Sequence, residues 1–123
     1  MADIRVLYTT WPDTDTAEQA GAEAVAERLA ACANILAPIR SVYRWKGAVE
    51  RAGEVPMTLK TTTEAADALA AFLAERHPYE TPCIIAIPVD RAGSYGDFLA
   101  WIEEEVVAPV VETITDEPVT PEA

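Results

Sequence analysis

The sequence predicts an α+β sandwich with elements in the order β-α-β-β-α-β and one added helix at the C-terminal end. Two observations lead to this prediction. Hydrophobic residues alternate with period two in some segments and recur every three or four residues in others. Half of the 123 residues are hydrophobic and 24% are charged, which is the composition of a folded globular chain. A chain of this length suffices for one compact domain.

The first third of the chain predicts a strand followed by a helix. The segment 4–10 is rich in β-branched and aromatic residues and is too short for a typical helix, so it is expected to be a strand. Asp15, with Glu18 three positions later, is typical of a helix start, and the helix is expected over 15–31. Its apolar stripe consists of Ala17, Gly21, Val25, Leu29 and Cys32.

The middle of the chain predicts two antiparallel strands joined by a tight turn. From residue 33 the sequence is again rich in β-branched and aromatic residues, up to Lys46-Gly47, where glycine permits a hairpin turn. The strand after the turn has two different faces. One face holds Val55, Met57, Leu59 and Thr61, and the other holds Glu54, Pro56, Thr58 and Lys60. The first face is expected in the core and the second in water or in a functional site.

The remainder predicts a helix, a buried strand and a further helix. Thr63 is a candidate cap for the second helix, which is expected to end at His77 before Pro78. Its inward stripe consists of Ala66, Leu69, Ala70 and Leu73. The stretch "CIIAIPV" follows as a buried strand. Ser94 with Asp97 is expected to open the last helix.

These elements form the split unit of a ferredoxin-like α+β sandwich. Residues 1–108 are expected to make one domain, and residues 109–123 a short acidic C-terminal tail that frays. The paired helices can cover only one face of the sheet. The other face is expected to be wet or to be covered by further subunits.

Charge and targeting signals narrow the function classes. Nine basic against 21 acidic residues give a net charge of −12, which disfavours nucleic acid and anionic membranes as partners. No segment approaches the length of about 18 apolar residues that a membrane span requires. The first residues lack a signal-peptide pattern, so a cytoplasmic protein is expected. Cys32 and Cys83 are interpreted as small buried thiols in a reducing compartment.

Four separated motifs resemble one known family. "ACANIL", "SVYRWKGAVE", "LKT" and "HPYETP" occur in the order seen in the CutA proteins, which are named for divalent-cation tolerance, and the match runs from about Ile4 to about Val106. The resemblance implies a ferredoxin-like protomer assembled as a tight homotrimer, similar to the PII signalling proteins, which bind effectors in clefts between subunits. It also implies a link to copper tolerance. Pro56 and Thr58 interrupt a strand that is usually apolar in this family, so an irregularity in the pairing of this strand is expected here.

The candidate ligand site is an intersubunit cleft formed by the hairpin, the strand after it and the loop that begins at His77. Its candidate residues are Trp45, Glu54, Lys60, His77, Tyr79 and Glu80. His77 has two interpretations: a helix end that hydrogen-bonds free carbonyls, or part of a ligand site stiffened by two prolines. Glu54 and Lys60 are six positions apart on one strand face, either as an ion pair or with Lys60 receiving an anion. Trp45 is either a subunit contact or a stacking surface.

A metal site is a further hypothesis. His77 with Cys83, and with Glu80 or a carboxylate from another subunit, could bind a divalent cation such as copper. The chain offers one histidine, two cysteines and two methionines, and it has no CxxC or HxxxH spacing. Soft metal ions favour these ligand types, so the composition allows few sites.

The leading functional hypothesis is a homotrimeric cytoplasmic module that responds to a small ligand or a metal and has no catalytic activity. The sequence contains no recognisable catalytic triad, glycine-rich phosphate loop or paired-carboxylate motif. Two alternatives remain open. One is a structural trimer that recruits another protein. The other is a hydrolase-type enzyme that uses Glu54, His77 or Tyr79 in the cleft.

Overall fold

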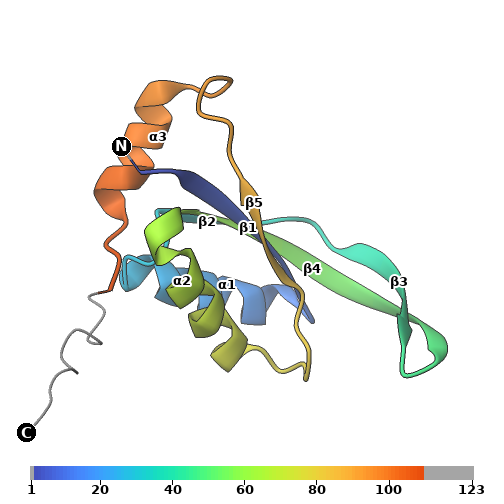
Figure 1. Cartoon of the computed structure of the whole chain (residues 1–123). Helices are drawn as coiled ribbons and strands as arrows, with labels where there is room; N and C mark the ends of the chain where they lie inside the picture. The colour runs from blue at the N-terminus through green and yellow to red at the C-terminus, as the bar shows by residue number, and fades with distance from the viewer. Residues whose placement is uncertain (1, 110–123) are drawn as a thin grey trace, which may run out of the picture.

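The strands form one antiparallel sheet with helices on both sides, as the computed structural model of residues 2–109 shows (Figure 1). The strands are β1 (Ile4–Trp11), β2 (Cys32–Ile35), β3 (Ile39–Trp45), β4 (Ala48–Thr62) and β5 (Ile84–Pro88). Their order is β2-β4-β1-β5, and β3 pairs with the far part of β4. The helices are α1 (Thr14–Ala26), α2 (Thr63–Arg76) and α3 (Gly96–Glu105). The predicted α+β order, with its added C-terminal helix, is confirmed.

The strand expected from residue 33 to the turn is divided in two. β2 ends at Ile35 and β3 begins at Ile39, with Pro38 between them. Pro56 lies on β4 opposite this break, where its carbonyl accepts a hydrogen bond from the backbone N–H of Leu36 (2.9 Å). In an antiparallel strand the N and O of one residue point to the same side, so the missing N–H of Pro56 faces the break. On the side of β4 that faces β1, Pro56 pairs with Thr10 and the register is regular.

The arm, residues 39–54, is the part of the β3–β4 hairpin that extends beyond the body of the molecule (Figure 1). At its tip Lys46 and Gly47 both have positive φ, +51° and +84°. Two successive positive φ values are those of a type I′ turn, which matches the twist of an antiparallel hairpin. The turn predicted at these two residues is therefore confirmed.

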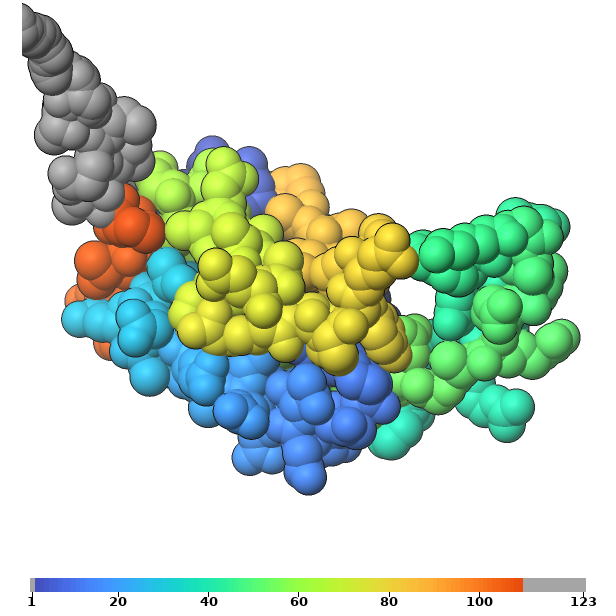
Figure 2. All heavy atoms as spheres, turned by 90° about the horizontal axis from the view of Figure 1, so that it is seen from below, coloured from blue at the N-terminus to red at the C-terminus, as the bar shows by residue number. Residues whose placement is uncertain are grey.

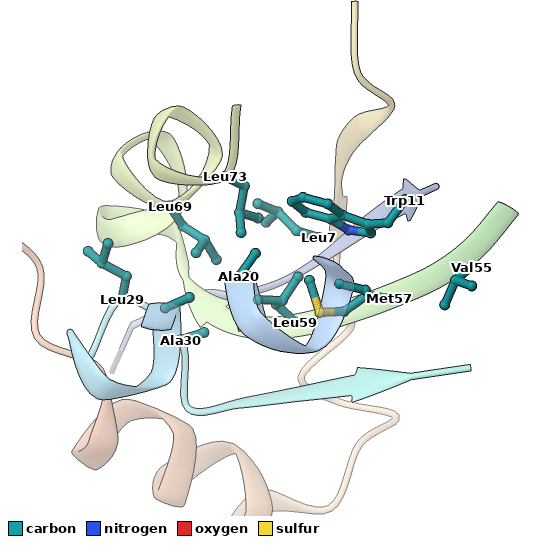
Figure 3. Packing of buried hydrophobic residues seen from close by; sticks show 12 residues of the cluster. Leu7, Trp11, Ala20, Leu29, Ala30, Val55, Met57, Leu59, Leu69 and Leu73 are labelled. Carbon is teal, nitrogen blue, oxygen red and sulfur yellow. The ribbon is translucent and has the colours of Figure 1, made fainter. Parts of the chain in front are cut away.

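The core lies between the sheet and the helix pair α1 and α2. Figure 3 shows Leu7, Met57 and Leu59 of the sheet facing Leu69 and Leu73 of α2. All of these side chains are at most 1% exposed. Larger members of a core contribute about 1.5–3 kcal/mol each by burial. The inward faces predicted for β4 and for the second helix are thus confirmed.

Helix α1 packs closely on the sheet through small residues. Its buried residues are Ala17, Ala20, Gly21 and Ala24. A Cβ at Gly21 would lie 2.8 Å from the sulfur of Met57 and 3.0 Å from the Cβ of Ala33, so the lack of a side chain at this position allows the close approach. Val25, which was expected in the buried stripe, is 37% exposed.

The first helix ends at Ala26, several residues before the predicted end at 31. Arg28 adopts a left-handed conformation with φ of +62°. Its N–H donates to the carbonyl of Val25 (3.0 Å), and the N–H of Leu29 donates to the carbonyl of Ala24 (3.0 Å). This is the hydrogen-bond pattern of a Schellman C-cap, which usually has glycine in that position. Because an arginine occupies it, the sequence does not reveal this helix end.

Arg28 also holds the end of α3. Its Nε donates to the carbonyl of Glu105 (2.9 Å) and its Nη2 to the carbonyl of Glu104 (3.0 Å). A guanidinium at a helix C-terminus satisfies free carbonyls and interacts favourably with the helix dipole. The ends of α1 and α3 are therefore joined by one side chain.

The helix starts differ in detail from the predicted ones. Asp13, not Asp15, caps α1, with its carboxylate accepting from the N–H of Thr16 (2.8 Å). Thr62, not Thr63, caps α2. The residue before α3 is Tyr95, and Ser94 instead donates to the carbonyl of Asp90 (2.6 Å). Each correction is a shift of one or two residues. At α1 and α2 neighbouring Asp and Thr side chains compete for the same cap, whereas Tyr95 makes no side-chain cap hydrogen bond at α3.

The sheet face turned away from α1 and α2 is left mostly uncovered, and we call it the open face. The registers place on it Val6, Tyr8, Cys32, Asn34, Thr58, Lys60, Ile85 and Ile87. Ile85 is 54% exposed and Ile87 is 44% exposed. Helix α3 covers one end of this side, where it packs on Ile4 (Figure 1). The expectation of one covered and one uncovered face is confirmed for the protomer.

Among residues 2–109, no helix has the length and apolarity needed to cross a membrane. The fraying predicted for the tail concerns residues that lie mostly outside the described part of the chain.

Candidate functional site

A cleft of about 700 Å³ separates the arm from the loop that follows α2, and we call it the arm cleft. Figure 2 shows the hollow between the β3–β4 hairpin and this loop. The lining combines aromatic, acidic, hydroxyl and apolar residues: Tyr8, Thr10, Ile39, Ser41, Val42, Tyr43, Trp45, Glu54, Pro78, Tyr79, Glu80, Thr81 and Cys83. The volume and the mixed lining are typical of small-molecule sites, which range over about 300–1,000 Å³.

Strand alternation gives the arm two chemically different faces. Ile39 pairs with Glu54, Ser41 with Ala52 and Tyr43 with Glu50, so these residues share the face that bears the cleft. The opposite face pairs Arg40 with Gly53, Val42 with Arg51 and Arg44 with Val49, and of these residues only Val42 also borders the cleft. The arginines of the arm therefore lie on the face away from the cleft. The cleft face is aromatic and acidic.

His77 fixes the start of the opposite wall. The residue is 8% exposed, and its Nε2 lies 2.7 Å from the carbonyl oxygen of Thr10. The backbone N–H of Tyr79 donates to its Nδ1 (3.2 Å). Because a carbonyl accepts only, Nε2 carries the proton and Nδ1 is the acceptor, which is the neutral tautomer. The pairing of β1 with β5 ends at Thr9, so His77 satisfies a carbonyl that would otherwise lack a partner.

Aromatic stacking holds His77 in this orientation. Its ring stacks on Trp11 with centroids 4.2 Å apart, and the ring of Tyr79 contacts it at a tilt with centroids 4.8 Å apart. The predicted hydrogen bond from the His77 side chain to the last carbonyls of its own helix is not formed, because the ring bonds the carbonyl of Thr10 on β1 instead. It positions the loop, and it does not line the cleft.

The donor set does not fit a metal within one chain. Both ring nitrogens of His77 are engaged by the backbone, so the predicted site with Cys83 would require breaking one of these bonds. In the described residues, no group of three His, Cys, Asp or Glu side chains is placed to hold a metal ion. Cys83 itself lies in the lining of the cleft.

Burial and nearby negative charge act together on Tyr79. Desolvation raises the pKa of its hydroxyl, and the carboxylate of Glu54 raises this pKa further, with smaller effects from Tyr43 and Asp13. The phenol is therefore neutral at physiological pH and can donate a hydrogen bond into the cleft. The contribution of Glu54 to this pKa shift indicates a negative potential at this wall.

Four of the six predicted ligand-site residues meet in the cleft: Trp45, Glu54, Tyr79 and Glu80. Lys60 does not join them. It lies further along β4 and lines a second, apolar groove of about 480 Å³ under α3. Its ammonium is hydrogen-bonded to Asn34 Oδ1 (2.5 Å). Glu54 and Lys60 do share a face, but six residues of strand separate them by roughly 20 Å, and the expected local ion pair is wrong.

Part of the lining was not predicted from the sequence. Ser41 and Tyr43 have the same strand parity as Trp45, which is a signal that could have found them. Tyr8 and Thr10 come from β1, and only the register of β1 on β4 places them beneath the arm. Lys46 was interpreted as part of the turn alone, yet its Nζ lies 3.6 Å from Glu80 Oε1.

The two cysteines are free thiols, as expected, but they are not buried. Cys32 is partly exposed on the open face and Cys83 is exposed at the cleft. Both positions lie beside the face that α1 and α2 leave uncovered, and the apolar sequence around each residue does not distinguish such a face from a core.

Comparison with known proteins yields a consistent result. The family model described as CutA1 divalent ion tolerance protein matches residues 5–105. The divalent-cation tolerance protein CutA of Citrobacter koseri is 41% identical over 97 residues, which cover 79% of this chain and 83% of that protein.

Solved structures agree with the sequence matches. The CutA1 of a psychrotrophic Shewanella species superposes with a TM-score of 0.80 at 33% identity, covering 85% of this chain and 96% of that one. The divalent cation tolerance protein of Thermus thermophilus gives 0.80 at 36% identity, with coverage of 85% and 99%. The Archaeoglobus fulgidus CutA, described as periplasmic, gives 0.79 at 38% identity, with coverage of 85% and 99%.

Proposed function

The chain belongs to the CutA1 divalent ion tolerance family, and from this premise we propose that it is a homotrimeric regulatory module that binds a small ligand in the arm cleft. The observation that carries the proposal is the continuity of the open face with the cleft. Tyr8 belongs to both, so a neighbour that covers the open face would border the ligand site. Ligand binding and subunit assembly would then share one surface.

The open face supports the assembly. Ile85 and Ile87 are large apolar side chains about half exposed in the protomer, and adjacent apolar residues of this kind are typical of interfaces. Closed symmetry is the usual outcome when identical chains cover such a face. The family resemblance implies a trimer.

The distribution of charge between the arm and the rest of the chain also supports the assembly. The arm has four Lys or Arg and two Glu, a net charge of +2, whereas the whole chain has −12 and the remainder therefore −14. A basic extension on an acidic body is complementary to the body of a second copy. The arm is thus suited to reach a neighbouring subunit.

The cleft supports ligand binding over a purely structural role. Trp45 and Tyr79 line it and do not fill it, and two carboxylates and several hydroxyls converge there. A scaffold that recruits another protein is the second candidate, because exposed Val49 (54%) lies among arginines on the far face of the arm, beside Val42 (63%), which also borders the cleft. Regulation without catalysis is favoured because the one imidazole is engaged in positioning the loop.

Native mass spectrometry of the full chain purified from its own host tests the proposal. We expect the mass of three subunits together with a retained small molecule. A monomer that shows no association in dilute solution would contradict it. A trimer that retains a protein and no small ligand would favour the scaffold. A broad substrate screen with activity above background, lost in Glu54→Gln, would instead favour the enzyme.

The relatives are named for divalent-cation tolerance, and we propose that this chain contributes to the same response. Copper binding by His77 and Cys83 stays a prediction. Titration of copper into the wild type and into His77→Ala tests it, and equal affinity in both removes this site.

We also propose a cytoplasmic location, supported by two free thiols among the described residues. Fractionation of the native host tests this, and recovery outside the cytoplasm would overturn it.

A further inference from the structure

We propose that the arm cleft is selective for a small organic cation, a ligand with an ammonium group held between aromatic rings and carboxylates. This inference rests on the proposed function, in which the cleft is the ligand site. It adds the chemical class of the ligand, which the family relationship does not specify.

The charged groups of the cleft are of one sign. Glu54 and Glu80 line it, and no Lys, Arg or His is among its lining residues within the described chain. Glu54 makes no ion pair with any described residue. The arginines of the arm lie on its other face, so they do not neutralise these carboxylates from within the cleft. A cation is the ligand type that such a site attracts.

Aromatic rings supply the second half of the recognition. Tyr8, Tyr43, Trp45 and Tyr79 come from three different segments and all border the cleft. The faces of aromatic rings carry negative partial charge and attract ammonium groups within about 6 Å. Rings combined with carboxylates are therefore better suited to an ammonium group than to a neutral or anionic molecule of the same size.

The chain already places one ammonium group in this environment. The Nζ of Lys46 lies 5.5 Å from the centroid of the Trp45 ring and 3.6 Å from Oε1 of Glu80. Both side chains of this ion pair are largely exposed, at 70% and 72%, so the pair is weak and easily exchanged. Lys46 thus occupies the rim as a substitute for the ligand. An incoming cation would compete with it for the same ring and the same carboxylate.

The ionisation of Tyr79 is consistent with this environment. Burial and then the carboxylate of Glu54 raise the pKa of its hydroxyl. A potential that disfavours a phenolate on this wall favours a bound cation by the same Coulombic effect.

The test uses two probes of nearly equal shape, choline and its neutral carbon analogue 3,3-dimethyl-1-butanol, with butyrate as an anion. Two-dimensional NMR of the full-length protein follows the amide signals of Trp45 and Tyr79 during titration. We expect shifts with choline that saturate, and weaker binding of the neutral analogue by about tenfold, which corresponds to the upper part of the range for cation–aromatic contacts.

Two variants sharpen the result. Glu54→Gln should weaken choline binding by about fivefold to tenfold, because it removes one carboxylate and keeps nearly the same size. Lys46→Met should strengthen it, because it removes the competing ammonium but keeps most of the stem. Glu104→Gln is the control. It removes one negative charge, as Glu54→Gln does, but at an exposed position on α3, and it should leave the affinity unchanged.

The outcomes separate the two proposals. Saturable shifts with the neutral analogue or butyrate, equal to or stronger than those with choline, would overturn the cation class and leave the cleft as a ligand site. No shift with any probe, in a protein that is also monomeric, would overturn the proposed function. No shift with any probe in an intact trimer overturns the cation proposal. Choline binding that is unaffected by Glu54→Gln also overturns it.

Discussion

The two faces of the sheet are built from the same strands and have opposite roles. On β4, Met57 and Leu59 point into the core and are fully buried, whereas Lys60, the next residue, lies on the open face. On β5, Ile84 packs against the core while Ile85 is 54% exposed. Apolar residues on the covered face hold the protomer together. Apolar residues on the open face contribute little to the protomer and are available to a neighbour.

The largest expected effect is on the covered face. Leu59→Ala should lower the free energy of unfolding by about 2–5 kcal/mol, because it leaves a cavity in a fully packed core. Urea unfolding at one fixed protein concentration measures it. Val49→Ala, at an exposed position on the arm, is the control and should change stability little. If the two variants lost similar stability, the contrast between buried and exposed apolar residues would be wrong.

The next effect concerns the open face. Ile85→Glu should leave the protomer folded but prevent assembly, because the charge would be buried without a partner between subunits. Sedimentation velocity should show the wild type as a trimer and the variant as a smaller species with an unchanged circular dichroism spectrum. Val25→Glu, at an exposed position on α1, should remain trimeric. A trimeric Ile85→Glu protein would show that the open face is not the interface.

A smaller effect is expected where the sheet meets the cleft. His77→Ala should destabilise the protein by about 1–3 kcal/mol, because the buried carbonyl of Thr10 loses its donor. The amide of Tyr79 should also exchange its hydrogen faster, since Nδ1 no longer accepts it. Hydrogen exchange followed by NMR measures this. Unchanged exchange at Tyr79 would mean that the ring does not hold the loop.

The smallest effect is at alkaline pH. The pKa of Tyr79 is raised in the folded state, so its contribution to stability is complete below about pH 10, the ordinary tyrosine value, and is lost as the pH rises through the higher folded value. Tyr79→Phe should therefore flatten the decline of stability above this pH. The exposed Tyr95 provides the control, because Tyr95→Phe should leave the decline as in the wild type. Identical alkaline profiles for wild type and Tyr79→Phe would contradict the prediction.

The fold was predictable because its signals are local. The Lys46-Gly47 turn, the two faces of β4 and the end of α2 before Pro78 each follow from a few neighbouring residues. The end of α1 was not predictable, because Arg28 occupies the left-handed position where glycine would have been a signal. Pro38 was a signal for the break between β2 and β3. That the break lies opposite Pro56 depends on the register of these strands on β4, which the local sequence does not specify.

The site was predictable only in part. Trp45 and Glu54 lie on one arm face because of strand alternation, and Tyr79 and Glu80 follow a helix end that two prolines mark. Lys60 was wrongly joined to them because parity specifies a face and not a position along a strand. Tyr8 comes from a distant strand, and no local pattern places it beneath the arm.

The attachment of the arm has a mechanical consequence. β1 ends opposite Val55 and β2 ends opposite Met57, so β4 is the one strand that runs unbroken from the body into the hairpin. The hairpin is therefore attached to the body at one end only. The twist of the β3–β4 ribbon sets both the distance of its tip from Tyr79 and the direction of its outer face. The width of the arm cleft and the position of the arm relative to a neighbouring molecule therefore change together.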